Sequence, residues 1–428
     1  MRMARMGLLT LTACGSPAAR LEFPNLPPDI RTLVIGSFHL GSLIEAKHLV
    51  RNELDTVRLE AVESEIDLEL AAYSEEDIGF PKGDLTPSAT GALLPATPAL
   101  FFRSEGLEIE KVPAAESRLL GISFSGKSAA GCAPLEAPAP MSMPSSTRLH
   151  AWSIGRGRAL VLADGGVLLF SKERGMVKLT HDFELTCPIG GFPTSSGLVV
   201  VTCAGEVFRG FVDFDRGSVA FRAWKDAPEG LQRAVAASGL ETPTGIQAVL
   251  LDSNGHLVRT SSASWERSEL ALAPALYRGH RIFPIGDRDY LAVSSGDNRA
   301  LHWRFDEEVL EPSSSSAGLM AVGRSSSNEL VLGDAESKFF RLENGRWELL
   351  QASALQLWVL DIEPFGDGFL FGSPFGNVGR YSKELGLCAT TRPLAHNVDE
   401  LVPLADDEML VLSGETEMLE WTVVSMLR

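Results

Sequence analysis

The C-terminal two-thirds of the chain repeats one pattern, in which an apolar strand, a tight polar turn and a second apolar strand follow one another. The copies begin 39, 50, 42, 39, 40 and 40 residues apart, at the apolar residues Leu160, Val199, Val249, Leu291, Leu330, Leu370 and Leu410. A period near 40 residues with four strands per unit is typical of a β-propeller. One copy cannot bury both faces of its sheet alone, so neighbouring copies must stack and the ring must close. The pattern predicts an all-β chain with a seven-bladed β-propeller over residues 148–428.

The fourth copy has the most explicit sequence. It contains Gly279-His280, a Leu-Ala-x-x-Ser element that begins at Leu291, the turn residue Asp297 and a terminal Trp303. This combination resembles a WD40 repeat, and the resemblance implies a WD40-like propeller in which His280 has a structural role. The last copy is similar but lacks the Gly-His pair, and the other five keep only the hydrophobic pattern. A divergent propeller of another family therefore stays open.

The last copy contains only three candidate strands before the chain stops at Arg428. An incomplete blade would expose an edge that pairs readily with other chains. We therefore expect an N-terminal strand, over residues 118–125, to supply the fourth strand and close the ring.

The segment before the repeats divides by composition. Residues 31–112 are β-rich, and over residues 66–70 apolar and acidic side chains alternate with the period of two that marks a half-buried strand. This predicts a small sandwich-like domain. Residues 113–147 would hold the closing strand and a linker rich in Pro, Ala and Ser. Residues 14–30 contain four prolines and are typical of a tether.

The first residues have the parts of an export signal. Arg2 and Arg5 precede a short apolar stretch, and small residues come before Cys14. Residues 11–14, Leu-Thr-Ala-Cys, resemble the lipobox of bacterial lipoproteins. The resemblance implies a signal peptide over residues 1–13 and a lipid on Cys14. We then expect a membrane-anchored protein of the cell envelope, in the outer membrane and periplasm or at the cell surface.

Composition and charge narrow the range of partners. Hydrophobic residues make up 45% and charged residues 22% of the chain, which is ordinary for a globular protein. The formal net charge is −18, whereas binding to nucleic acid needs a cationic surface. Nucleic acid is therefore not an expected partner. No later segment is long and apolar enough for a transmembrane helix, so the lipid would provide the contact with the membrane.

Five cysteines occur, and four remain if the first carries lipid. An even number of cysteines in an exported chain favours disulfides. Cys187 and Cys203 each lie eight residues from Ser195, the expected tip of a hairpin, and facing residues of a hairpin lie close enough for a bridge. We predict this disulfide, with two buried thiols as the alternative. Pairing of Cys132 with Cys388 stays open.

Acidic residues recur in the turns between second and third strands, at Asp164, Asp252, Asp297, Asp334 and Glu415. These turns project from one end of the ring, where an acidic cluster could bind a cation or a basic partner. Tight turns also favour Asp for purely structural reasons. The eight histidines show no metal-ligand spacing, and no familiar catalytic motif occurs. We expect neither a metal nor a cofactor.

These observations favour a lipid-anchored envelope protein whose propeller is a non-catalytic scaffold for a protein partner, or for a glycan. The alternative is an exported glycan hydrolase or lyase that uses acidic loop residues. Two carboxyl groups about 5–9.5 Å apart in a deep central pocket would favour the enzyme. A plugged centre with unperturbed carboxyl groups would favour the scaffold.

Overall fold

The structure is a computed structural model, and the residues that it describes are 18–23, 26–39, 42–56, 58–60, 65–74, 76, 83–85, 100–108, 118–121, 135–144, 149–163, 166–181, 185–243, 245–260, 264–274, 280–286, 288–304, 307–312, 318–335, 338–343, 346–351, 358–384, 386–414 and 418–426. Within these ranges the regular structure is β-strand apart from two short 3-10 helices, η1 (Arg51–Thr56) and η3 (Pro374–Gly376). The predicted all-β class is confirmed.

From residue 149 onward, the described strands form six successive four-stranded antiparallel units and three strands of a seventh, which we call blades 1 to 7. Blade 1 holds β11 (Leu149–Ser153), β12 (Arg158–Ala163), β13 (Gly166–Ser171) and β14 (Gly175–Lys178). Blade 2 holds β16 (Pro188–Thr194), β17 (Gly197–Thr202), β18 (Val207–Asp213) and β19 (Ser218–Lys225). Blade 3 holds β20 (Ala234–Thr242), β21 (Gly245–Asp252), β22 (His256–Thr260) and β23 (Trp265–Ala271).

Blade 4 holds β24 (His280–Gly286), β25 (Asp289–Ser294), β26 (Arg299–Arg304) and β27 (Glu307–Pro312). Blade 5 holds β28 (Leu319–Arg324), β29 (Leu330–Asp334), β30 (Phe339–Glu343) and β31 (Arg346–Gln351). Blade 6 holds β32 (Asp361–Phe365), β33 (Gly368–Gly372), β34 (Val378–Ser382) and β35 (Gly386–Thr391). Blade 7 contains β36 (Glu400–Ala405), β37 (Glu408–Ser413) and β38 (Met418–Met426).

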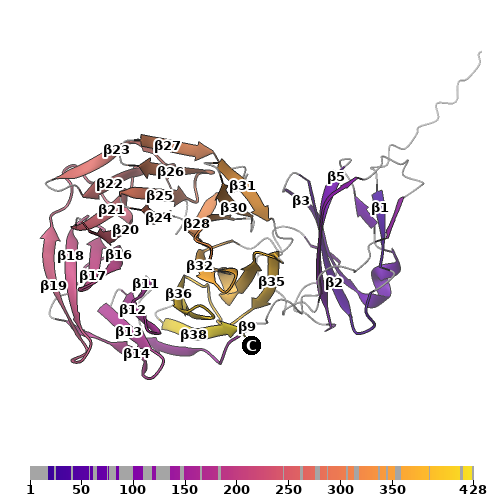
Figure 1. Ribbon diagram of the computed structural model, residues 1–428, viewed down its shortest axis with the longest axis horizontal. Helices are drawn as coiled ribbons and strands as arrows, with labels where there is room; N and C mark the ends of the chain where they lie inside the picture. The colour runs from indigo at the N-terminus through magenta and orange to yellow at the C-terminus, as the bar shows by residue number, and fades with distance from the viewer. Residues whose placement is uncertain are drawn as a thin grey trace, which may run out of the picture.

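The blades close into a ring, which Figure 1 shows face-on. The first strand of each blade contacts the first strand of the next, and β36 of blade 7 contacts β11 of blade 1. Between blades 2 and 3 a parallel bridge joins β16 to β20, and the short strand β15 (Thr180–His181) extends blade 2 at β19. The C-terminal part of the chain is therefore a β-propeller.

The fourth strand of blade 7 comes from the N-terminal side of the repeats, although not from residues 118–125. It is β10 (Met141–Pro144), which pairs antiparallel with β38, and β9 (Leu135–Glu136) pairs with the end of the same strand. Residues 118–121 instead form β8, which pairs in parallel with β1. The segment that closes the ring lies in the Pro-rich stretch that resembles a linker, where only four residues pair and Pro144 is tolerated because β10 is an edge strand.

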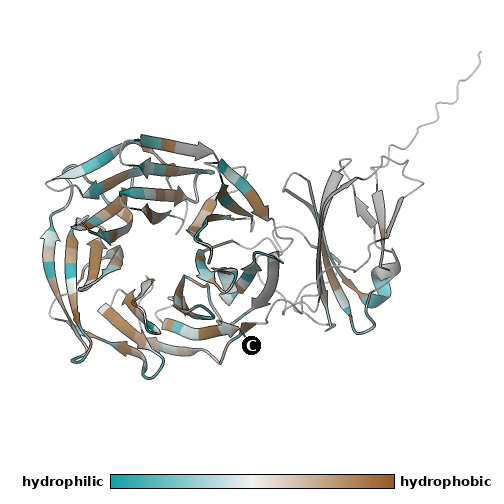
Figure 2. Cartoon of the chain, viewed as in Figure 1, coloured by the Kyte–Doolittle hydropathy of each residue, from teal (hydrophilic) through white to brown (hydrophobic). Residues whose placement is uncertain are grey.

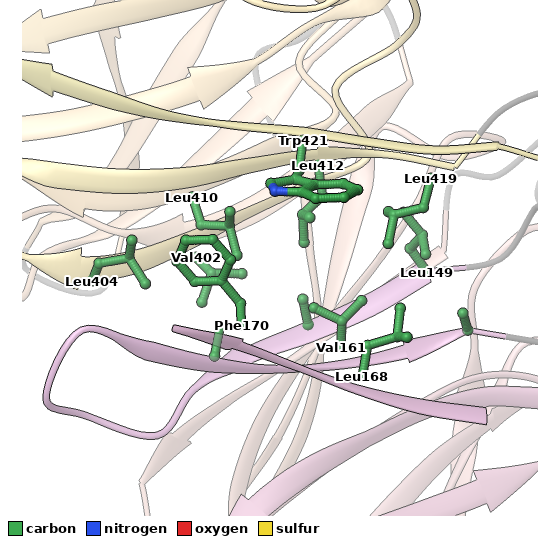
Figure 3. Close-up of a cluster of buried hydrophobic side chains, with 13 residues drawn as sticks. Leu149, Val161, Leu168, Phe170, Val402, Leu404, Leu410, Leu412, Leu419 and Trp421 are labelled. Carbon is green, nitrogen blue, oxygen red and sulfur yellow. The ribbon is translucent and has the colours of Figure 1, made fainter. Parts of the chain in front are cut away.

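Apolar side chains fill the seam between the last and first blades, as Figure 3 shows. The buried members of this cluster are Leu149, Ala151, Ala159, Val161, Ala163, Leu168, Phe170, Val402, Leu404, Leu410, Leu412, Leu419 and Trp421. Met143 of the closing strand packs against them. Full burial of a large apolar side chain is worth about 1.5–3 kcal/mol, so the seam contributes strongly to ring closure. Figure 2 shows the same preference for hydrophobic positions along the strands throughout the ring.

The N-terminal strands form two further sheets, with the orders β6-β3-β2-β5-β7 and β4-β1-β8. Their bounds are β1 (Ala18–Glu22), β2 (Thr32–His39), β3 (Ser42–Val50), β4 (Arg58–Glu60), β5 (Glu65–Tyr73), β6 (Gly83–Leu85), β7 (Leu100–Glu108) and β8 (Arg118–Gly121). In β5, Leu68 and Leu70 are fully buried, in agreement with the alternating pattern. Val34, Ala46 and Tyr73 belong to the same buried cluster as apolar residues of blades 5 and 6. The two parts of the chain therefore share a packed contact.

Candidate binding site at the centre of the ring

Polar and charged side chains gather where the first strands of four blades begin. In the second strand of each blade, we consider the residue two positions after the leading apolar residue of the repeat. In four blades this residue pairs with a polar or charged first-strand residue, namely His150, Arg281, Asp361 or Glu400. They therefore occupy one register position in blades 1, 4, 6 and 7, and we call them the central layer. The same position in blades 2, 3 and 5 holds Gly190, Ala236 and Val322. The end of the ring at which all first strands begin is called the leading end.

Arg281 reaches from blade 4 to blades 6 and 7. Its Nη2 donates hydrogen bonds to the carbonyl oxygens of Leu360, at 3.0 Å, and Asp399, at 3.2 Å. Its Nη1 lies 3.6 Å from Oε1 of Glu400. On the blade 1 side, Nδ1 of His150 lies 3.7 Å from that same oxygen. One carboxylate oxygen therefore faces an imidazole and a guanidinium from different blades.

The two acidic residues of β32 are held differently. The buried Asp361 accepts a hydrogen bond from the backbone N–H of Leu401 at 2.7 Å, which links blade 6 to blade 7. Glu363 lies two residues further along the strand and is half-buried. The backbone of Glu363 pairs with Leu370 of β33. Among the described residues, none engages the carboxyl group of Glu363 through a hydrogen bond or ion pair.

Burial raises the pKa of Glu400 well above its usual range, and the neighbouring Asp361 and Asp399 act in the same direction against the opposing charge of Arg281. Burial, with the charges of Asp361 and Glu400, also raises the pKa of Glu363 well above its usual range. Removal from water disfavours the ionised form of a carboxyl group, and nearby negative charges add to that effect. The carboxyl groups at the centre therefore hold protons more tightly than exposed ones do.

The layer below the central layer contains three aromatic residues. It pairs with the leading apolar residues of the repeats and consists of Trp152, Phe192, Ser238, Phe283, Arg324, Glu363 and Val402. The guanidinium of Arg324 lies 5.4 Å from the ring centroid of Phe283. The ring of Trp152 stacks on that of His150, with the centroids 6.4 Å apart. Glu363 therefore lies in a layer that also presents rings and one more cation.

An exposed tryptophan lies at the leading end. Trp358 is 47% exposed and precedes β32 by three residues. Its neighbour Val359 donates its N–H to the carbonyl of Asp334, and the carbonyl of Leu360 accepts from Arg281. These two hydrogen bonds hold the backbone that follows Trp358, so Trp358 lies beside the central layer.

The predicted acidic turn residues have local structural roles where they are described. Oδ1 of Asp252, which is 1% exposed, accepts the backbone N–H groups of Asn254 and His256, and Oδ2 pairs with Arg267. Asp297 pairs with Arg299 through both carboxylate oxygens and accepts the N–H of Ala273. Asp334 is fully buried and accepts the N–H of Lys338 at 2.8 Å. Asp164 and Glu415 lie outside the described residues.

A disulfide joins Cys187 and Cys203, whose Cα atoms are 5.6 Å apart. The hairpin does not turn at Ser195 alone, because Thr194 pairs with Gly197 and the tip has two residues. If that register continued along the hairpin, Cys187 would face the residue after Cys203 rather than Cys203 itself. A bulge between Pro188 and Gly190 shifts the pairing back, and Cys203 donates its N–H to the carbonyl of Cys187. The pairing is as predicted, but a bulge that was not foreseen makes it possible.

Several of the predicted features lie outside the described residues or rest on side chains that are not described. Cys14 and Cys132 are outside them, as is the side chain of Cys388. Within the described residues, no helix is long and apolar enough to cross a membrane. In that same part of the chain, no three His, Cys, Asp or Glu side chains are arranged to hold a metal ion.

The sequence interpretation missed the central layer, although the sequence carries a signal for it. His150, Arg281, Asp361 and Glu400 each precede the leading apolar residue of their repeat by nine or ten positions. Charged or titratable residues recur at that offset in the first strands of four copies. Aligning the copies on their first strands, rather than on their turns, would have shown the four residues together.

Comparison with known proteins supports the fold. No family model matches the sequence, and no curated protein matches it. The chain is similar to the structure of YCF48 bound to D1 peptide, with a TM-score of 0.51 and 14% identity over 69% of this chain and 96% of that chain. It is also similar to the WD40 β-propeller domain of Doa1, with a TM-score of 0.52 and 11% identity over 67% of this chain and 96% of that one. These similarities show a WD40-like β-propeller.

Proposed function

We propose that this protein is a non-catalytic binding scaffold of the cell envelope. Its propeller binds a protein partner at the leading end of the ring, and a lipid on Cys14 holds it at a membrane. The observation that carries the proposal is the central layer, where charged residues of four blades meet beside the exposed Trp358. Tryptophan and charged side chains near the middle of a surface are typical of residues that dominate protein interfaces.

The chemistry of the centre favours a basic segment of a partner over a glycan. Asp361, Asp399 and Glu400 place three carboxyl groups around the guanidinium of Arg281, and the carboxyl group of Glu363 lies beside those of Asp361 and Glu400. The excess of carboxyl groups over cationic groups attracts a lysine or arginine side chain. The exposed indole of Trp358 offers that side chain a cation–π contact. YCF48, which has a similar fold, is described as bound to a peptide, so a ring of this kind is suited to holding a segment of polypeptide.

Site-specific photocrosslinking tests the proposal. A photoreactive phenylalanine analogue replaces Trp358, and in a matched variant it replaces Val309, which is 37% exposed on the outer strand of blade 4. We expect one discrete crosslinked protein from position 358 in intact envelopes and none from position 309. The captured protein is identified by mass spectrometry, purified and titrated against the wild type and Glu363→Gln.

The expected result is weaker binding to Glu363→Gln, because the variant loses the unengaged carboxylate. Equal crosslinking from both positions, or equal binding to wild type and Glu363→Gln, would show that the leading end is not the binding surface.

The enzyme alternative is favoured by one observation, the raised pKa values of Glu363 and Glu400, since catalytic acids commonly have such values. The geometry weighs against it. Arg281 and His150 engage Glu400, and the backbone of Leu401 engages Asp361. A pair of carboxyl groups that act as acid and base needs both groups available to substrate. Loss of a measurable glycan hydrolysis in Glu363→Gln would favour the enzyme over the scaffold.

A further inference from the structure

Glu400 connects three blades that are far apart in the sequence. Its Oε1 faces Nδ1 of His150 from blade 1 at 3.7 Å and Nη1 of Arg281 from blade 4 at 3.6 Å. The side chain of Glu400 is 13% exposed, and those of His150 and Arg281 are each 26% exposed. The three groups are therefore shielded from bulk water but remain within reach of solvent protons.

The charged and titratable groups around this contact come from four first strands, β11, β24, β32 and β36. They are His150 of β11, His280 and Arg281 of β24, Asp361 and Glu363 of β32, and Asp399 and Glu400 at the start of β36. Arg324 of β28 lies one layer deeper, against Phe283. Burial lowers the pKa of His280 to about 4, so this neighbour stays neutral over the weakly acid range. Glu400 is the acceptor shared between the cationic or protonatable groups of blades 1 and 4.

We propose that Glu400 is a proton-operated clamp at the leading end of the ring: the ionised carboxylate holds His150 and Arg281 together, and the protonated carboxyl group releases them. The inference rests on the proposed function in one respect, because the clamp would regulate the surface to which we assign the partner. The clamp itself is a property of the isolated chain.

Protonation changes the balance of charge in one step. A neutral Glu400 no longer offers an anionic acceptor shared by the guanidinium of Arg281 and the imidazole of His150. Arg281 keeps its hydrogen bonds to the carbonyl oxygens of Leu360 and Asp399, so its head group stays with blades 6 and 7. The displacement therefore falls on β11, which contacts β36 at the seam of the ring. Burial raises the pKa of Glu400, which moves this release to a higher pH than that of an exposed carboxyl group.

Hydrogen exchange measured by mass spectrometry tests the clamp on the purified full chain without a partner. Exchange in peptides that cover β11 is compared at about pH 8 and about pH 5.5, the range in which imidazoles and raised carboxyl groups titrate, after correction for intrinsic rates. We expect wild-type β11 to exchange about tenfold faster at the lower pH, which corresponds to about 1.4 kcal/mol of lost protection. Glu400→Gln should exchange at the faster rate at both pH values.

The matched control is Glu229→Gln, an exposed acidic residue between β19 and β20, which should respond to pH as the wild type does. Trp152 gives a second readout, because its ring stacks on His150 and its fluorescence should change in the wild type but not in His150→Asn. This second variant keeps the test valid if Glu400→Gln folds poorly. The clamp would be overturned if hydrogen exchange in wild-type β11 did not depend on pH. It would also be overturned if Glu400→Gln or His150→Asn responded to pH as strongly as the wild type. Because no partner is present, these results do not depend on the crosslinking experiment.

Discussion

At the scale of single residues, the centre of the ring contains a carboxyl group, that of Glu363, whose ionisation is unfavourable. Glu363 is half-buried, and its carboxyl group has no hydrogen bond or ion pair among the described residues; burial, together with the neighbouring Asp361 and Glu400, raises its pKa. A carboxyl group in this position lowers the stability of the fold once it must ionise. Binding sites commonly retain such unfavourable groups because a ligand, rather than the fold, satisfies them.

Replacement of Glu363 by Gln should therefore stabilise the protein at neutral and alkaline pH. The pKa of Glu363 is higher in the folded than in the unfolded chain, so the folded state binds more protons and loses stability as pH rises through that interval. The variant should gain of the order of 1 kcal/mol above the interval and nothing below the unfolded pKa. Urea unfolding across pH measures this, with Glu229→Gln as the control. A variant that is less stable than wild type at alkaline pH would contradict the assignment.

At the scale of the element, the periodic pattern was sufficient to predict the strands, and local irregularities were not visible in it. The repeat of apolar residues near every 40 positions predicted the propeller, because stacked sheets must bury both faces. The closing strand was misplaced because β10 has only four paired residues, Met141–Pro144, inside a Pro-rich stretch. The bulge that aligns Cys187 with Cys203 has no sequence signal of its own. A strand pairing that depends on a β-bulge of one residue can be identified only from the structure.

The two methionines of β10 provide a test of ring closure. Met143 packs against the apolar seam of blades 7 and 1, whereas Met141 is 50% exposed. Met143→Ala should lower the free energy of unfolding by about 1–2 kcal/mol, less than the 2–5 kcal/mol typical of a fully buried methionine. Met141→Ala should change it by less than about 0.5 kcal/mol. Chemical denaturation of both variants measures the difference, and equal effects would mean that β10 does not contribute to closing the seam.

At the scale of the whole molecule, the proposed membrane location depends on the proposed lipid on Cys14. The formal net charge of the chain is −18, and loss of residues 1–13 would remove Arg2 and Arg5 and leave it more acidic. An anionic membrane surface repels such a protein, so electrostatic attraction cannot hold it there. One acyl chain binds a membrane only marginally, whereas two or more hold a protein firmly. A lipid on Cys14 would therefore account for the whole of its membrane affinity.

Cys14→Ala should then move the protein from the membrane fraction to the soluble fraction, with an unchanged circular dichroism spectrum and melting temperature, because residue 14 precedes the first strand, β1. Ser16→Ala, two residues away, is the matched control and should stay with membranes. The wild type should resist a high-salt wash, since salt screens charge but does not weaken apolar anchoring. Mass spectrometry of the wild type should find an acylated Cys14 as the first residue. A Cys14→Ala protein that still pellets with salt-washed membranes would require another anchor, and the contact would then have to come from the propeller or from the N-terminal sheets.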